Sequence, residues 1–324
     1  MKILMYSSRP YDKLSFRKEL ENYSNVEIDF IETSLNEKTV ELAKGYAAVC
    51  VFVNDIVNKD VLERLSALQV NLVLCRCIGT NNVDLDAAKM LNIDVKNVSY
   101  SPESVAEHAL ALLMTVNRHT HTAYNRIREN DFTLSGLSGY CLHGKTVGII
   151  GLGRIGQAFA RICHGLGMNI IAYDPMLTGN EMFVSDTTGS ETAFKVNLVT
   201  LDELYRTSDV ISLHLPLTKK TKHIVNEESI NKMKQDVILL NVSRGALIDT
   251  DALVNNITKF FGVGLDVYEG EESNAFKNHE DEILINNPVS KLNYRNVVVT
   301  SHQAFLTDVS LKQIAKMTIE NAIQ

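Results

Sequence analysis

The feature that most constrains the fold is a glycine-rich turn that directly follows a run of Val and Ile. Residues 147–156 read Val-Gly-Ile-Ile-Gly-Leu-Gly-Arg-Ile-Gly, so three glycines have the spacing G-x-G-x-x-G. In a strand–turn–helix unit, Gly151 would allow the sharp turn, Gly153 would let a pyrophosphate approach the backbone, and Gly156 would let the helix pack closely on the sheet. The helix that follows would direct free N–H groups and its positive dipole end at the phosphates. We therefore expect a dinucleotide-binding fold here.

An acidic residue follows at the spacing that such a fold requires. A second strand-like run, residues 169–174, ends in Asp174, 18 residues after Gly156. A carboxylate about 20 residues beyond the glycines typically accepts a hydrogen bond from a ribose 2′-hydroxyl. Residues 175–178 (Pro-Met-Leu-Thr) include no Arg or Lys that could bind a 2′-phosphate. The pattern predicts NAD rather than NADP, and the alternative is a glycine-rich turn with a purely structural role.

Length, charge and cysteine usage limit the class of protein. A chain of 324 residues is long enough for two domains, and a net charge of −7 argues against nucleic acid or an anionic membrane as partner. The N-terminus reads as a strand rather than a signal peptide, and the apolar helix at 106–116 is too short to span a bilayer. The five cysteines have no metal-like spacing. We expect a cytoplasmic protein with buried reduced thiols, no metal site and a small-molecule ligand.

The order of predicted elements indicates two α/β domains. Five predicted strands alternate with four predicted helices before the glycine-rich turn: strands at 2–6, 26–31, 48–52, 72–76 and 94–97, helices at 13–23, 37–45, 59–67 and 85–90. A long helix begins at Pro102. Further strands are expected at 198–199, 210–213, 237–242, 262–267 and 297–300. We expect a domain formed by residues 1–101 and 300–324, with the final helix 307–323 returning to it, and a doubly wound dinucleotide-binding domain at 102–299.

Three residues with reactive side chains stand just past the ends of late strands, namely Arg244, Glu271 and His302. In an open parallel sheet, ligands bind outside the carboxyl ends of the strands, so these side chains should converge. An arginine can hold a carboxylate through two charge-assisted hydrogen bonds. A histidine can give a proton to a carbonyl oxygen, and a neighbouring carboxylate favours its protonated form and orients the ring. Together they would form an acid catalyst with a substrate clamp.

Each of these residues also has a structural interpretation. Arg244 could cap a strand end or form a surface ion pair, and Glu271 could belong to a solvated acidic loop. His302 could be a structural histidine, and Asp266, near a strand end, could simply bind loop backbone. The residues alone leave both interpretations open.

Several stretches in combination carry a resemblance to a known family. They are residues 154–156 with Asp174, 241–249 (Asn-Val-Ser-Arg-Gly-Ala-Leu-Ile-Asp), 265–271 (Leu-Asp-Val-Tyr-Glu-Gly-Glu), 300–307 (Thr-Ser-His-Gln-Ala-Phe-Leu-Thr), 76–88 and 100–108. The chain resembles the D-isomer-specific 2-hydroxyacid dehydrogenases over nearly its whole length, and most closely the bacterial fermentative D-lactate dehydrogenases. The resemblance implies an α/β fold of two Rossmann-like domains with parallel sheets. The doubly wound NAD domain would be inserted into a discontinuous, flavodoxin-like substrate domain.

The resemblance also implies roles for individual residues. Arg244 would bind the substrate carboxylate, His302 would be the proton donor and Glu271 its partner. Substrate would further meet the backbone N–H groups of Ile78 and Gly79 and the side chains of Tyr100 and Phe305. Cofactor contacts beyond the three glycines are implied for Arg154 and Ile155 at the pyrophosphate, Asp174 at the ribose, Leu215, Pro216 and Thr221 along the cleft, and Val242, Ser243 and Asp266 near the nicotinamide.

The activity implied by the resemblance is reduction of pyruvate to D-lactate by NADH, in a homodimer or homotetramer whose contact would include the helix after Pro102. Phe305, Leu306 and Phe52 would wall a small apolar pocket, although Phe52 could equally be a core residue. Alternatives are a dehydrogenase of a larger D-2-hydroxy acid, such as hydroxyisocaproate or phenyllactate, and a D-lactate-forming enzyme of a glycopeptide-resistance pathway. An NAD-sensing protein whose output is partner recruitment is an alternative from a different class.

Overall fold

The structure is a computed structural model that describes residues 1–185, 193–271, 276, 279–280 and 287–324. The chain divides into two units, one formed by Met1–Ser101 with Phe305–Gln324 and the other by Pro102–Ala304. The family resemblance assigns substrate binding to the first unit and NAD binding to the second.

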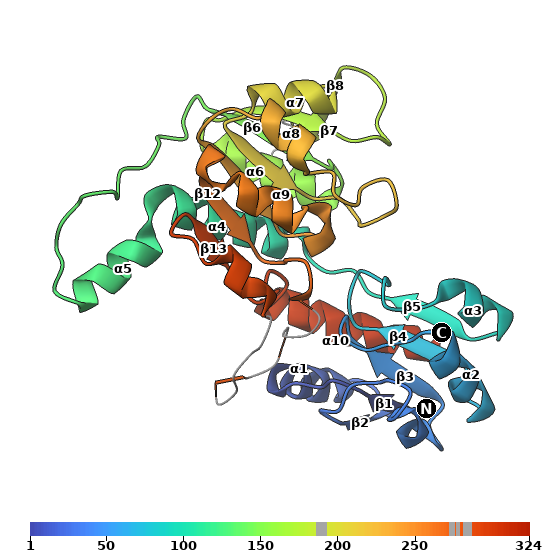
Figure 1. Ribbon diagram of the computed structural model, residues 1–324. Coiled ribbons are helices and arrows are strands. Elements are labelled where there is room, and N and C mark those ends of the chain that lie inside the picture. Colours follow the sequence, from blue (N-terminus) through green and yellow to red (C-terminus); the bar gives the residue numbers. More distant parts are fainter. Residues whose placement is uncertain (186–192, 272–275, 277–278, 281–286) are drawn as a thin grey trace. The chain divides into compact units, whose positions relative to one another are not determined.

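The first unit contains a five-stranded parallel sheet with the order β2-β1-β3-β4-β5, which is the flavodoxin-like order. Its strands are β1 (Lys2–Met5), β2 (Glu27–Phe30), β3 (Ala48–Val51), β4 (Leu72–Cys75) and β5 (Asp94–Asn97). Its helices are α1 (Pro10–Leu20), the 3₁₀ helix η1 (Val40–Ala43), α2 (Lys59–Ala67), α3 (Leu85–Met90) and α10 (Asp308–Ile323). All residues of the central strands β3 and β4 are buried, as expected for a sheet with both faces covered. Helices α1 and α10 pack side by side (Figure 1).

Side-chain caps set where several of these helices begin. The side chains of Asn58, Asp84 and Thr307 accept hydrogen bonds from backbone N–H groups in the first turns of α2, α3 and α10. Each cap satisfies a donor that the helix itself leaves unpaired.

The second unit contains an eight-stranded sheet with the order β13-β12-β11-β10-β6-β7-β9-β8. Its strands are β6 (Thr146–Ile150), β7 (Asn169–Tyr173), β8 (Glu181–Ser185), β9 (Ala193–Leu198), β10 (Val210–Leu213), β11 (Val237–Asn241), β12 (Phe260–Leu265) and β13 (Val297–Val299). Its helices are α4 (Pro102–Arg118), α5 (Thr120–Arg128), α6 (Arg154–Gly165), α7 (Leu201–Thr207), α8 (Glu227–Lys232) and α9 (Thr250–Asn255), with 3₁₀ helices η2 (Gly245–Leu247), η3 (Ile257–Lys259) and η5 (Pro288–Leu292). The strand order reverses between β6 and β10, and a ligand crevice forms at such a switch point.

The predicted fold class is confirmed, with several local corrections. Strand β8 pairs antiparallel with β9, so the second sheet is not wholly parallel. The helix predicted at 37–45 is only the single 3₁₀ turn η1. His119 adopts a left-handed φ of 49°, which separates α5 from α4. Cys141 is exposed, whereas the other four cysteines are buried as predicted.

The predicted boundary at residue 300 also needs a correction, because residues 300–304 lie with the second unit. Thr300 N donates to Leu265 O, and the N–H groups of Gln303 and Ala304 donate to the Asp266 carboxylate. These bonds fix the segment to the end of β12, so the chain leaves the second unit only at Phe305.

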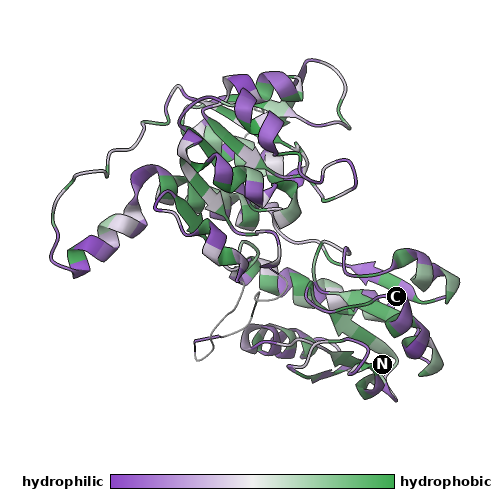
Figure 2. Cartoon of the chain, in the orientation of Figure 1, coloured by the Kyte–Doolittle hydropathy of each residue, from purple (hydrophilic) through white to green (hydrophobic). Residues whose placement is uncertain are grey.

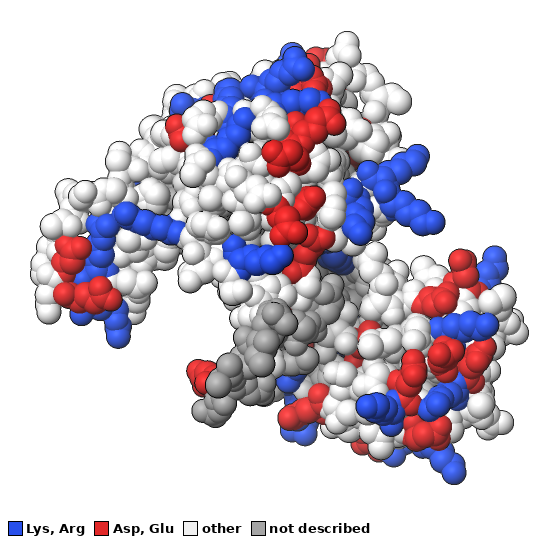
Figure 3. All heavy atoms as spheres, viewed as in Figure 1, with Lys and Arg blue, Asp and Glu red and all other residues white. Residues whose placement is uncertain are grey.

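The surface and interior of each unit follow the usual partition. Apolar residues lie along the central strands, while the outer sides of the helices carry polar residues (Figure 2). On the face shown in Figure 3, acidic and basic side chains are interspersed over each unit. No helix in the described part of the chain is long and apolar enough to cross a membrane. The described residues also include no cluster of three or more His, Cys, Asp or Glu side chains that could hold a metal ion.

Candidate active site

The three glycines of the turn after β6 have different surroundings. Gly151 has a φ of +97°, and a Cβ there would lie 2.6 Å from the carbonyl oxygen of His214. A Cβ on Gly156 would lie 2.1 Å from the carbonyl oxygen of Gly151. At Gly153, which precedes α6, a Cβ would meet nothing within 4 Å. The first and third glycines are therefore required by the chain's own packing, whereas the space at Gly153 is open to another molecule.

Asp174 is tied to this turn from the end of the neighbouring strand β7. One of its carboxylate oxygens accepts from Leu152 N at 2.9 Å, and the other accepts from Met176 N at 2.9 Å. The carboxylate thus lies beside the turn with only two of its acceptor positions used by backbone. An open glycine cradle, the N-terminus of a helix and an anchored carboxylate together fit a dinucleotide.

Most of the other predicted cofactor residues lie in loops at the same edge of the sheet, while Arg154 and Ile155 begin α6. Leu215 is buried close to Gly151, and Thr221 Oγ1 donates to Pro216 O at 2.7 Å across the loop after β10. After β11, Ser243 Oγ donates to Leu213 O at 2.9 Å. The remaining members of the predicted set also have described positions: Arg154 is exposed, Ile155 is partly buried and Val242 is buried.

A histidine–carboxylate pair lies beyond β12 and β13. His302 Nδ1 is 2.9 Å from Glu271 Oε1, and only 16% and 11% of these two side chains is exposed. His302 has a left-handed φ of +52°. The structure therefore brings together two of the three residues singled out as chemically reactive.

The turn that carries His302 is organised by Asp266, whose residue is fully buried. Its carboxylate accepts from Thr300 Oγ1 at 2.6 Å and from the backbone of Gln303 and Ala304, while its carbonyl accepts from His302 N at 2.8 Å. Burial alone would raise the pKa of Asp266, but hydrogen bonds from His108 and Thr300 outweigh it and lower the pKa. These contacts agree with the interpretation in which Asp266 binds loop backbone.

His108 is a residue that the sequence analysis did not single out. Its Nε2 lies 3.2 Å from Asp266 Oδ1 and 3.0 Å from Thr300 Oγ1. The sequence shows only that His108 and Leu112, four residues apart, share one face of the helix. The structure adds that Leu112 on this face packs on Gly264 of β12, which brings His108 to the end of that strand.

Arg244 lies in the loop after β11, the strand next to β12. Its carbonyl accepts from Asn241 Nδ2 at 2.8 Å, and its Nη1 donates to Ser243 O at 2.7 Å. Its guanidinium forms no ion pair with any described residue. The partly buried arginine therefore keeps hydrogen-bonding capacity for an anion.

In the first unit, the predicted substrate-binding residues form two groups: Ile78 and Gly79 in the loop after β4, and the aromatic residues Tyr100 and Phe305. The loop after β4 is held by a hydrogen bond from Asn97 Nδ2 to Ile78 O at 2.6 Å and by one from the Cys77 thiol to Gly79 O at 3.2 Å. The ring of Phe305 lies 6.4 Å from that of Tyr100 and 5.7 Å from that of Phe52.

Phe52 is a core residue, as one of its two interpretations proposed. It is only 5% exposed, and the guanidinium of Arg76 lies 4.2 Å above its ring. Arg76 is itself buried and pairs with Asp12 at 3.2 Å. Phe52 therefore has little surface left for a ligand in this unit.

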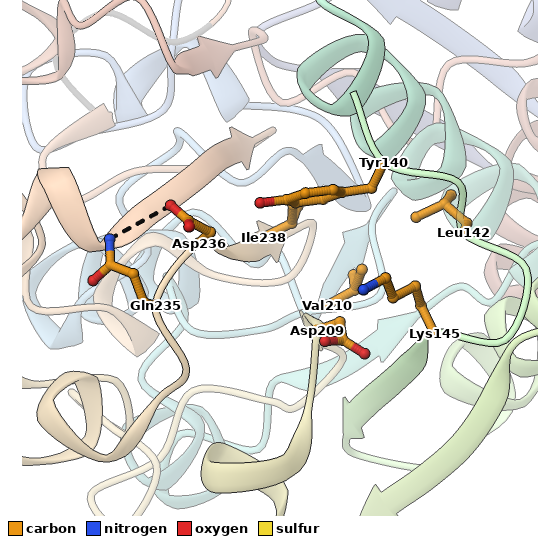
Figure 4. Close-up of a pocket in the computed structure, with 8 residues that line it drawn as sticks. All are labelled: Tyr140, Leu142, Lys145, Asp209, Val210, Gln235, Asp236 and Ile238. Carbon is orange, nitrogen blue, oxygen red and sulfur yellow. Dashed lines mark hydrogen bonds between the residues drawn. The ribbon is translucent and has the colours of Figure 1, made fainter. Parts of the chain in front are cut away.

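A cavity of about 140 Å³ in the second unit lies away from the glycine cradle and from the His302–Glu271 pair. It is lined by Tyr140, Leu142, Lys145, Asp209, Val210, Gln235, Asp236 and Ile238 (Figure 4). Lys145, Asp209 and Asp236 directly precede β6, β10 and β11, so the cavity lies at the amino ends of these strands. The cradle and the His302–Glu271 pair lie at the carboxyl ends.

Comparison with known proteins gives the family. The second unit, with its glycine cradle and histidine–carboxylate pair, has the features of an NAD-dependent dehydrogenase domain. Residues 110–304 match the family model of the D-isomer specific 2-hydroxyacid dehydrogenase, NAD binding domain. A 2-hydroxyacid dehydrogenase homolog of Haemophilus influenzae is 45% identical over 325 residues, which covers 99% of this chain and 95% of the relative.

Two solved structures support the same assignment. The apo-structure of D-lactate dehydrogenase from Escherichia coli matches with a TM-score of 0.83 and 40% identity, covering 100% of this chain and 96% of that one. The structure of D-2-hydroxyisocaproate dehydrogenase matches with a TM-score of 0.84 and 29% identity, again covering 100% and 96%. The chain belongs to the D-isomer-specific 2-hydroxyacid dehydrogenase family and is an NAD-dependent D-2-hydroxyacid dehydrogenase. The expectation of NAD from the sequence is thereby confirmed.

Proposed function

We propose that this enzyme reduces pyruvate to D-lactate with NADH. The observation that carries the proposal is the His302–Glu271 pair, held at 2.9 Å beyond strands β12 and β13. Strand β12 lies next to β11, the strand that leads to Arg244. The similarity to the Escherichia coli protein named D-lactate dehydrogenase favours pyruvate as the 2-oxo acid.

Each of the three residues has a definite part in the proposed reaction. NADH, when bound, supplies the hydride that reduces C2 of the 2-oxo acid. Arg244 holds the substrate carboxylate through two parallel hydrogen bonds. Glu271 occupies Nδ1 of His302 and so orients the ring, which leaves Nε2 to protonate the carbonyl oxygen as the hydride arrives.

The remaining assignments are part of the same proposal. Asp174 binds the adenosine ribose, and the pyrophosphate approaches the backbone at Gly153. The backbone N–H groups of Ile78 and Gly79 and the side chain of Tyr100 also bind the substrate carboxylate in this proposal. We also infer a cytoplasmic location for the enzyme.

A larger 2-oxo acid is the second candidate substrate. The match to D-2-hydroxyisocaproate dehydrogenase supports it. An apolar pocket distinguishes substrates that differ by one methylene by only about 1–3 kcal/mol. Some activity on larger 2-oxo acids is therefore expected even if pyruvate is preferred.

The test is a panel of 2-oxo acids with NADH, namely pyruvate, 2-oxobutyrate, 2-oxoisocaproate and phenylpyruvate, followed by a stereospecific lactate assay. We expect the highest kcat/KM with pyruvate and D-lactate as the product. A higher kcat/KM with 2-oxoisocaproate or phenylpyruvate would favour the second candidate. An absence of NADH oxidation with every acid would favour a binding protein.

The assignment of Arg244 is tested by Arg244→Lys. Lysine keeps the positive charge but loses the two-pronged geometry. We expect a higher KM for pyruvate and a lower kcat, with little change in the Kd of NADH. Unchanged kinetics would contradict the role of this arginine as the carboxylate clamp.

We also propose that the enzyme is a homodimer or homotetramer, with a different contact from the one that the sequence suggested. Helix α4 packs on α6, β11 and β12 of its own unit. Large exposed apolar side chains instead lie on α5 and the segment after it. This part of the chain projects from the rest of the second unit (Figure 1). The apolar side chains are those of Tyr124, Ile127, Phe132 and Leu134, between 58% and 82% exposed. If these side chains form the contact, the assembly formed by the variant Phe132→Ser/Leu134→Ser in solution should have a lower molar mass than the wild-type assembly.

A further inference from the structure

The loops that carry Arg244 and Glu271 both meet a third loop, which follows β10, at His223. His223 N donates to Ala246 O at 2.9 Å, and Val225 N donates to Leu247 O at 3.0 Å. Residues 223–225 therefore run alongside the residues that directly follow Arg244.

The side chain of His223 contacts the other loop. Its Nε2 lies 2.7 Å from Oε1 of Glu269, which stands two residues before Glu271. The second oxygen of Glu269 accepts from Thr250 N at 3.1 Å, at the start of α9. His223 Nδ1 lies 3.8 Å from the Asp249 carboxylate. The Glu269 carboxylate thus joins the loop after β12 to the loop after β10 and to helix α9, which follows Arg244 in the chain.

Gly245 brings the backbones of the Arg244 and Glu271 loops into direct contact. A Cβ on Gly245 would lie 2.2 Å from the carbonyl atoms of Tyr268 and 2.6 Å from Glu269 N. His223 itself has a φ of +51°, a conformation that is uncommon for a residue with a side chain and needs surrounding contacts to hold it. A displacement of Glu269 would therefore be transmitted both to Arg244 and to Glu271.

We propose that His223, through its contact with Glu269, is a positioning residue. It fixes the position of Arg244 relative to the His302–Glu271 pair. This inference rests on the proposed function, because it takes Arg244 as the carboxylate clamp and His302 as the proton donor. His223 itself touches none of the reacting atoms in this scheme. Its effect is mechanical, through the backbone of residues 244–246 and 268–271.

A matched set of substitutions tests this proposal. His223→Ala removes the contact with Glu269, whereas His223→Gln can place an amide nitrogen where Nε2 lies. The asparagine of His223→Asn is also polar, but its side chain is too short to reach the Glu269 carboxylate. The exposed His143, which lies at the amino ends of the strands, gives the control His143→Ala. Kinetics with pyruvate, the Kd of NADH, thermal unfolding and the ¹⁵N chemical shifts of the histidine rings are measured for each.

Because a misplacement of about 1 Å in a catalytic group can reduce the rate about 100-fold, we expect kcat/KM for pyruvate to fall about 10- to 100-fold in His223→Ala and His223→Asn. His223→Gln should recover most of the loss, and the Kd of NADH should change less than twofold. Glu269→Ala should lose about as much as His223→Ala, and the double variant no more than either, because the two side chains act as one unit. The ring ¹⁵N shifts of His302 should change in His223→Ala and return in His223→Gln.

Three results would overturn the proposal: unchanged kcat/KM together with unchanged His302 shifts in folded His223→Ala, equal losses in the Gln and Asn variants, or additive losses in the double variant. The NMR measurement does not depend on turnover. If the wild type reduces no 2-oxo acid, the proposed function fails, while a His302 shift change that Gln restores still supports the positioning by His223.

Discussion

Replacing Gly245 with alanine adds one methyl group where the loop after β11 touches the loop after β12. The new Cβ would lie 2.2 Å from the carbonyl carbon and oxygen of Tyr268, which are backbone atoms that cannot rotate away. Unbonded carbon atoms pack at about 3.5–4.0 Å. The two loops must therefore separate by more than about 1 Å to admit the methyl group.

A separation of this size moves Arg244 relative to Glu271, and through Glu271 relative to His302. A misplacement of about 1 Å can cost about 100-fold in rate, so we expect kcat/KM for pyruvate to fall about 100-fold in Gly245→Ala. Overpacking of a well-packed region costs about 1–3 kcal/mol, so the variant should fold with a lower free energy of unfolding. The Kd of NADH should change less than kcat/KM, because the glycine cradle lies after β6.

The assay compares steady-state kinetics, NADH binding by fluorescence and urea unfolding for Gly245→Ala and for Gly165→Ala. Gly165 is the matched control because it ends α6, where an added Cβ meets nothing within 4 Å. Alanine should stabilise that helix by about 0.5–1 kcal/mol and leave the kinetics unchanged. If folded Gly245→Ala keeps at least half of the wild-type kcat/KM, the close contact of the two loops does not set the catalytic geometry.

Substitutions in the glycine cradle, at His108 beside Asp266 and at the buried His214 have distinct expected effects. Gly153→Ala should fold normally, because its Cβ would meet nothing within 4 Å. It should raise the Kd of NADH about 10-fold or more by obstructing the pyrophosphate. An unchanged Kd in a fluorescence titration would contradict the assignment of Gly153 to the pyrophosphate site. His108→Phe should lower the free energy of unfolding in urea by about 1.5–3 kcal/mol and reduce kcat, because the buried Asp266 carboxylate loses its hydrogen bond from His108; His108→Gln is the control. Burial lowers the pKa of His214 from 6.5 to about 3, so the unfolded chain takes up a proton as pH falls below 6.5 and the native chain does not until about pH 3. Stability should therefore fall by up to about 2 kcal/mol between pH 7 and pH 5, and His214→Asn should remove that part of the pH dependence of urea unfolding.

Much of the fold could be predicted from local patterns because many elements have clear boundaries. Helix α2, helix α3 and strands β5 and β10 have the predicted limits. The two helices begin directly after the caps Asn58 and Asp84, and β10 is a short, fully buried apolar run. Where capping residues and apolar runs agree with the tertiary structure, the sequence is sufficient.

The hairpin of β8 and β9 was missed because its pattern differs from that of a buried parallel strand. Residues of β9 alternate between exposed and buried along Ala193–Leu198, and β8 forms the edge of the sheet. In this region, the apolar run at residues 198–199 is the only part for which the sequence predicts a strand. The length of the segment 273–296, between Glu271 and His302, also resembles that of the D-lactate dehydrogenases, and this segment lies partly outside the described residues.

At the candidate site, the sequence predicted which strand ends carry the reactive residues but not how they are held. Arg244, Glu271 and His302 could be found because each follows a strand of the same sheet. The turn at His302 depends on contacts with Asp266, 36 residues earlier, and on His108 from α4. Such long-range contacts leave no local periodicity, so only the three-dimensional structure shows them.

Helix α10 has a consequence for synthesis on the ribosome. It packs on α1, β4 and β5, and Ser15 Oγ donates to Leu311 O at 2.8 Å. Roughly 200 residues separate the two parts of this unit, so at roughly 5–20 residues per second the nascent sheet waits roughly 10–40 s for its last helix. The continuous second unit can fold during that delay. Nascent chains stalled just before Asp308 should therefore contain a protease-resistant second unit beside a protease-sensitive first one, whose apolar face is available to chaperones.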